Sequence, residues 1–132
     1  MLRILLTLSC CCFTFFSFAQ TQGELNETAR QEFLKANQEL NHVYHKVLKA
    51  YKADTVFTRN FRIAQRAWLQ FRDAEMKAVF PDRPAEVTGS IAPMCYSLQL
   101  AELTRQRTKR LKEWLHGVRQ GELCGGSIKL RE

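Results

Sequence analysis

Apolar side chains recur at helical spacing along three long stretches of the chain. In the first stretch, from about Asn26 to Ala53, apolar residues stand three, four or seven positions apart, which places them on one face of an α-helix. Asn26 can cap this helix, and neither Gly nor Pro interrupts it. The expected buried stripe consists of Phe33, Leu40, Tyr44, Val47, Leu48 and Tyr51.

The second stretch predicts a helix from about Thr55 to Val79. Asp54 or Thr55 is suited to cap its start, and Pro81 and Pro84 end it, because proline cannot continue a helix. Its expected buried face consists of Phe57, Phe61, Ala64, Trp68, Phe71 and Ala78.

The third stretch predicts a helix that starts between Ile91 and Met94 and runs to about Leu115 or His116. Gly117 is a suitable stop, since glycine tolerates the backbone conformation in which many helices end. The residues expected on its common face are Met94, Leu98, Ala101, Thr104, Thr108, Leu111 and Leu115.

No stretch alternates between apolar and polar residues as a half-buried strand does. The fold class we predict is therefore all-α, a bundle of three main helices in a domain over residues 20–118. Residues 119–132 form a short irregular C-terminal tail, which Leu123, Ile128 and Leu130 could dock on the bundle.

Residues 1–19 have the pattern of a cleavable secretory signal peptide. Arg3 precedes an apolar run of about 15 residues, shorter than the roughly 20 needed to cross a membrane, and small residues at Ser17 and Ala19 suit a signal peptidase. We expect cleavage before Gln20, no transmembrane anchor afterwards, and a periplasmic or secreted protein. The less favoured alternative is a lipoprotein signal, because cysteines 10–12 lie within the apolar run.

After cleavage the chain would carry 19 Lys and Arg against 13 Asp and Glu, a formal charge of +6. A basic exported domain can bind anionic polymers, lipid headgroups or acidic proteins, although the same charge can simply keep it in solution. The third helix carries many basic residues, which form either an anion-binding face or a solvated face. No nucleic-acid fold signature or regular interleaving of aromatics accompanies them, so we expect no nucleic-acid partner. They are Arg105, Arg107, Lys109, Arg110 and Lys112.

The chain resembles the LprI-type lysozyme-inhibitor domain, a family of exported bacterial helical domains. The most specific matching segment is AQRAWLQFRDAE at residues 64–75, and weaker matches are TQGELNE at 21–27, ELNHVY at 39–44, and GS at 89–90 followed by LTRQRT at 103–108. The positions at which the family usually carries cysteines hold Thr28, Met76 and Gln99 here, so the family's disulfides are missing.

This resemblance implies an exported helical fold and two hypotheses for function. The first is a binding module that resembles the inhibitors and blocks a lysozyme-like cell-wall hydrolase. The alternative is a structural or adhesive envelope protein whose basic face binds anionic wall or lipid surfaces.

A cluster of charged residues on the second helix also has two interpretations. Arg62, Arg66, Arg72 and Asp73 lie near two aromatic residues of the expected core. In the structural interpretation, an arginine lays its stem on apolar surface and pairs with a carboxylate, for which Glu39, Glu102 and Asp73 are candidates. In the functional interpretation, these four residues, with Arg105 and Arg107 of the third helix, belong to a polar docking surface.

Two cysteines remain after cleavage, Cys95 and Cys124. A straight helix from Cys95 to Gly117 is about 33 Å long, and the remaining residues to Cys124 reach at most about 25 Å, whereas the Cα atoms of a disulfide lie within roughly 7 Å. A Cys95–Cys124 disulfide therefore needs a shorter or broken helix, or a tail that folds fully back. That bond, pairing between two chains, and free thiols all stay open.

The sequence contains no recognisable catalytic set, and Gly89-Ser90 is not the G-x-S-x-G motif of hydrolases. Glu39, His42 and His45 have a three-residue spacing that helical metal sites use, but the outer two diverge by about 120° around the helix. We therefore predict neither an enzyme nor a metal or cofactor site.

Overall fold

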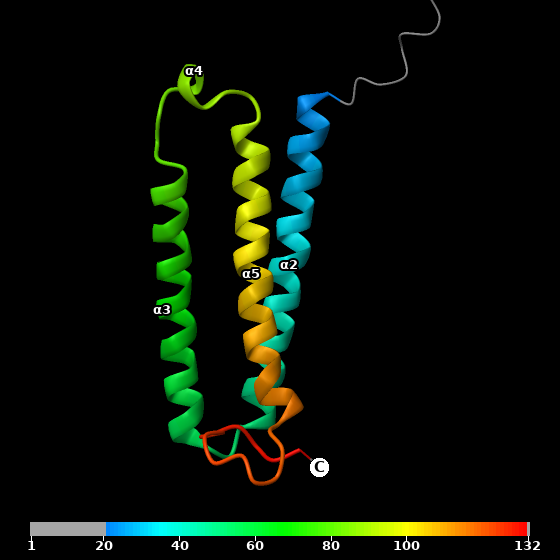
Figure 1. Cartoon of the computed structure of the whole chain (residues 1–132), viewed down its shortest axis with the longest axis vertical. Coiled ribbons are helices and arrows are strands. Elements are labelled where there is room, and N and C mark those ends of the chain that lie inside the picture. Colours follow the sequence, from blue (N-terminus) through cyan, green and yellow to red (C-terminus); the bar gives the residue numbers. More distant parts are fainter. Residues whose placement is uncertain (1–20, 132) are drawn as a thin grey trace, which may run out of the picture.

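The computed structural model describes residues 21–131, so the predicted signal peptide lies outside the described residues. Its helices are α2 (Gln22–Ala50), α3 (Thr55–Val79), the single turn α4 (Ala85–Thr88) and α5 (Ala92–His116). The three long helices lie side by side, with α2 and α5 running in the same direction and α3 in the opposite one (Figure 1). The predicted all-α bundle of three main helices is confirmed.

The start of α3 and the end of α5 follow the capping residues of the sequence, whereas α2 ends at Ala50 and not near Ala53, and α5 begins without a side-chain cap. The side chain of Asp54 accepts a hydrogen bond from the amide of Phe57 at 2.9 Å, which confirms the predicted start of α3. Asn26 is not the cap of α2. That helix begins earlier, because Thr21 and Glu24 form a capping box in which each side chain accepts a hydrogen bond from the other's amide, at 3.3 and 3.1 Å.

The α2–α5 pair is the closest helix packing in the described part of the chain. Small side chains make this approach possible, since Ala29 and Ala36 of α2 and Ala101 of α5 are buried. The buried hydroxyls of Thr104 and Thr108 donate to backbone carbonyls one turn earlier in α5, at 2.7 and 2.9 Å. The interface therefore contains polar residues without leaving these hydroxyls unpaired.

Helix α3 is held by larger side chains. Phe61 is buried, and its ring lies 5.5 Å from the rings of both Tyr44 of α2 and Trp114 of α5. Leu40, Val47 and Leu111 complete the adjoining core. Because large aromatic groups fill the space, the backbone of α3 stands farther from α5 than that of α2 does.

The faces predicted for the second and third helices are partly wrong. Ala64, Phe71 and Ala78 are exposed, and Phe71 leaves 59% of its surface in solvent. The inward face of α3 is turned by about one position and includes four buried residues, Thr58, Phe61, Gln65 and Met76. On α5, Leu98 and Leu115 are likewise exposed.

The tail docks through polar contacts. Leu123 and Leu130 are 96% and 58% exposed, so the prediction that they anchor the tail is wrong, whereas Ile128, the third residue of that prediction, is partly buried. Instead, the hydroxyl of Tyr51 donates to the carbonyl of Trp114 and accepts from the amide of Lys129, both at 3.0 Å. Lys129 Nζ also donates to the carbonyl of Ala50 at 2.8 Å, so the tail satisfies a backbone group at the end of α2.

We expect the Tyr51→Phe substitution to lower the free energy of unfolding by about 1–2 kcal/mol, because it leaves two backbone groups without a partner. Urea denaturation of the protein without residues 1–19 measures this change. Tyr44→Phe is the control, since the hydroxyl of Tyr44 has no hydrogen bond within residues 21–131, and an equal loss in both variants would contradict the bridging role of Tyr51.

Candidate functional site

Arg72 is an inner residue of α3. Its side chain is only 12% exposed, and it donates two hydrogen bonds to one carboxylate oxygen of Asp73, at 2.9 and 2.7 Å. Its guanidinium lies over the rings of Trp68 and Phe33, 5.4 and 6.0 Å from their centroids. The arginine therefore covers apolar surface, as the structural interpretation proposed, but its carboxylate partner lies on its own helix and not on another one.

Arg107 connects α5 to α3. Its Nε donates to the side-chain oxygen of the buried Gln65 at 3.0 Å, and its guanidinium lies 5.7 Å from the centroid of Trp68. Burial lowers the pKa of Arg107, and the nearby charge of Arg110 lowers that pKa further. Arg107 is thus part of the helix packing around Trp68.

Ion pairs tie other cations of α5 to α2. Arg105 pairs with Glu32 at 2.7 Å, and Lys112 pairs with Glu39 at 2.6 Å. These side chains are substantially exposed, so each pair contributes at most about 1 kcal/mol. By contrast, Arg62 and Arg66 are exposed and form no ion pair within the described residues.

The six arginine and aspartate residues selected from the sequence therefore do not form one open docking surface. Arg72 and Arg107 belong to the inner packing around Trp68, Arg105 to a pair between α2 and α5, and the others to solvent-facing positions.

Neither Cys95 nor Cys124 forms a disulfide within residues 21–131. Cys95 lies in the first turn of α5, Cys124 lies in the tail, and the unbroken length of α5 separates them (Figure 1). The intramolecular disulfide is therefore not formed.

The spaced residues Glu39, His42 and His45 lie on the outer surface of α2, and Glu39 is engaged by Lys112. Across residues 21–131, no three His, Cys, Asp or Glu side chains are grouped as a metal site requires.

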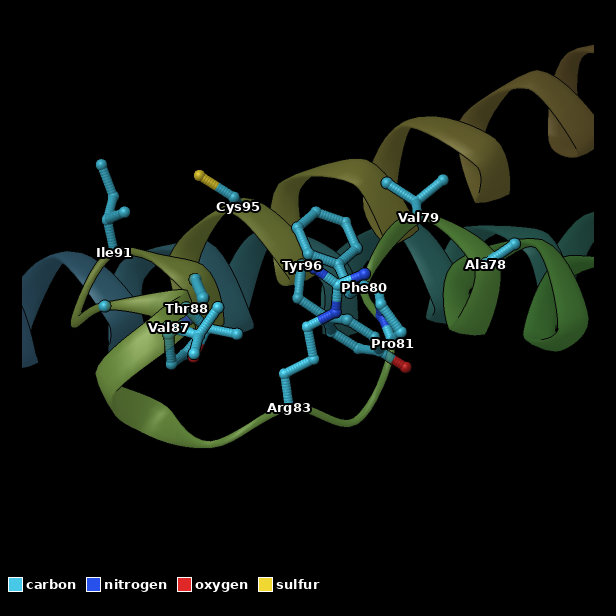
Figure 2. A pocket seen from close by; sticks show the side chains of 13 residues that line it. Ala78, Val79, Phe80, Pro81, Arg83, Val87, Thr88, Ile91, Cys95 and Tyr96 are labelled. Carbon is cyan, nitrogen blue, oxygen red and sulfur yellow. The ribbon is translucent and has the colours of Figure 1, made fainter.

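The connection between α3 and α5 forms an apolar groove that the sequence pattern did not predict. Its volume is about 650 Å³. Figure 2 shows Tyr96 and Phe80 at its centre, with Val79, at the end of α3, on one side and Val87, in α4, on the opposite side. The two aromatic rings meet edge to face with centroids 5.6 Å apart.

Several large apolar side chains of this groove face solvent. Val79, Val87, Ile91 and Tyr96 are 54%, 65%, 51% and 40% exposed. Clustered apolar surface of this kind is typical of interaction sites. The only sequence signal for it was the presence of apolar residues in a segment otherwise marked by Pro and Gly.

Charge is divided unequally along the bundle. The contacts of Arg105 with Glu32 and of Arg107 with Gln65 lie at about the same height along the bundle. We use this height to divide the three helices into two halves. On the side of the tail, residues 35–65 and 107–131 hold 13 Lys and Arg against 4 Asp and Glu, a formal charge of +9. We call this the basic half.

On the side of α4, residues 21–34 and 66–106 hold 6 Lys and Arg against 8 Asp and Glu, a formal charge of −2. We call this the acidic half. The two halves lie at opposite ends of the long axis in Figure 1, and the groove belongs to the acidic half.

A family model described as lysozyme inhibitor LprI matches residues 17–111. The chain belongs to the LprI lysozyme-inhibitor family. The match includes α2, α3, the groove segment and most of α5 of this LprI domain, in agreement with the resemblance noted from the sequence, and it leaves out the tail.

This LprI domain is also 38% identical over 112 residues to an uncharacterized protein, R02472, of Rhizobium meliloti strain 1021. That similarity covers 76% of the chain and 78% of the relative. No solved structure matches the LprI domain significantly. Among its described residues, no helix has both the length and the apolarity needed to cross a membrane.

Proposed function

We propose that this protein is an exported binding module that blocks a lysozyme-type cell-wall hydrolase. The observation that carries the proposal is the LprI family match, which spans almost the whole helical bundle. The signal-peptide pattern of residues 1–19 supports export to the compartment in which such hydrolases act.

The groove at the α4 end is the surface we assign to the hydrolase. Its exposed valine, isoleucine and tyrosine side chains offer the apolar centre that a stable interface needs. Asp82 lies in the same connection, next to Arg83, which lines the groove, and the surrounding half carries a formal charge of −2. This combination suits a basic enzyme surface, and many lysozymes are basic.

The net charge of the protein would otherwise oppose this partner. A uniform +6 would repel a basic hydrolase and slow association. However, α5 has 25 residues and so spans about 37 Å, whereas electrostatic interactions are screened beyond about 10 Å at 0.1 M salt. An enzyme at the groove therefore experiences mainly the acidic half.

The experiment is a muramidase assay on cell walls with a molar excess of the protein lacking residues 1–19. We expect hydrolysis to fall, and the fall to be larger for basic hydrolases than for acidic ones. Undiminished activity of several lysozyme types would contradict the proposed inhibition.

A second candidate function, attachment to anionic envelope surfaces, is favoured by the concentration of cations in the basic half. It does not compete with inhibition, because the two functions use opposite ends of the bundle.

A further inference from the structure

We infer that the basic half binds the surface of an anionic lipid bilayer and places the tail at the membrane interface. The first observation is the formal charge of +9 over residues 35–65 and 107–131. Each Lys or Arg near an anionic membrane surface adds to the attraction, and this charge is collected at one end of an elongated molecule.

Many of these cations are available. The exposed cations of the basic half that form no ion pair within the described residues include Lys46, Lys49, Lys52, Arg59, Arg62, Lys109 and Arg119. Lys49 lies in the last turn of α2, Lys52 in the turn that follows it, Arg59 in the first turns of α3, and Arg119 in the tail. All four come from segments that meet at the tail end of the bundle (Figure 1).

The second observation is exposed apolar surface among these charges. Leu123 is 96% exposed in the tail, and Val56, at the start of α3, is 58% exposed. A leucine so fully in water contributes almost nothing to folding, whereas its transfer to the interface of a bilayer is favourable.

The combination distinguishes a bilayer from a soluble polyanion. A polyanion such as a wall polymer would engage the cations and leave Leu123 in water. A lipid surface engages both, because anionic headgroups lie directly above the apolar acyl chains. We therefore assign the basic half to lipid.

This placement also orients the molecule. With the tail on the membrane, the groove faces away from it, at the far end of α5 (Figure 1). The assignment rests on the second candidate function, attachment to anionic envelope surfaces, and not on the proposed inhibition, since a protein without inhibitory activity would bind vesicles equally well.

The test is co-sedimentation of the protein lacking residues 1–19 with vesicles of phosphatidylglycerol and phosphatidylethanolamine, or of phosphatidylcholine alone. We expect binding only to the anionic vesicles, weakened by high salt. Equal binding to both vesicle types, or to neither, would overturn the inference.

Two variants examine the two observations separately. Replacing Lys49 and Lys52 together by Gln is expected to weaken binding on the order of 30-fold. The matched control replaces Arg30 and Lys77 of the acidic half by Gln, which removes the same charge, and is expected to change binding less than twofold. Equal losses in both variants would mean that net charge alone, and not this surface, attracts the protein.

Leu123→Ser is expected to weaken vesicle binding roughly fivefold, because it removes apolar surface from the interface. Retention on a soluble anionic wall polymer should be unaffected by this change. Vesicle binding that is insensitive to Leu123→Ser and is displaced fully by the polymer would overturn the lipid assignment in favour of the polymer.

Discussion

The Val87→Arg variant should lose inhibition of a basic muramidase, with an inhibition constant about 30-fold higher than that of the unchanged protein. Val87 is 65% exposed at the rim of the apolar groove. The substitution removes an apolar contact and places a cation against a basic surface, and like charges brought together across an interface commonly cause a loss of this size or more.

The same change should leave the fold intact, since substitutions at exposed positions usually alter the free energy of unfolding by less than about 0.5 kcal/mol. The control is Val56→Arg, because Val56 has a similar exposure of 58% but lies in the basic half. Equal inhibition by the two variants would place the hydrolase elsewhere, whereas absence of inhibition by the unchanged protein would remove the proposed function itself.

The positions of the helices could largely be predicted from the sequence, because capping and helix-breaking residues act on the backbone next to them. Asp54 and Gly117 act where they were expected to act, since a cap needs only its own first or last turn. The start of α2 was missed because the capping box of Thr21 and Glu24 competes with Asn26 for the same role, and the box pairs two amides where a single cap pairs one.

The buried faces of the helices were harder to predict, because hydrophobic periodicity locates the buried stripe only to within about one residue position. Arg72 illustrates the reason. The buried face expected from periodicity includes Phe71 and leaves out Arg72, but the Arg72 guanidinium stacks on Trp68 and Phe33, and Arg72 takes an inner position while Phe71 turns outward. Such a stack depends on residues from two helices, so one helical stripe does not show it.

The candidate site was hardest to predict, since it depends on chain segments that are distant in sequence. The groove combines the end of α3, the turn α4 and the start of α5. The separation into acidic and basic halves likewise appears only when antiparallel helices are aligned, because neither half is continuous in the chain.

The Leu111→Ala substitution should lower the free energy of unfolding by about 3–4 kcal/mol. Leu111 has no exposed surface and lies among Leu40, Val47 and Phe61 in the core that joins the three helices. Truncation removes buried apolar contacts and leaves a cavity that helices held by side-chain interlocking close only partly. A marginally stable domain of this size would lose a large share of its stability.

Leu98→Ala is the matched control, because periodicity assigns Leu98 and Leu111 to the same buried face of the third helix, whereas Leu98 is 44% exposed. We expect it to cost less than about 1 kcal/mol. Urea denaturation of both variants distinguishes the buried face predicted from periodicity from the buried face seen in the structure. Similar losses would support the face predicted from sequence, whereas a difference of at least 2 kcal/mol between them follows only from the packing of α5 against α2 and the aromatic side chains of α3.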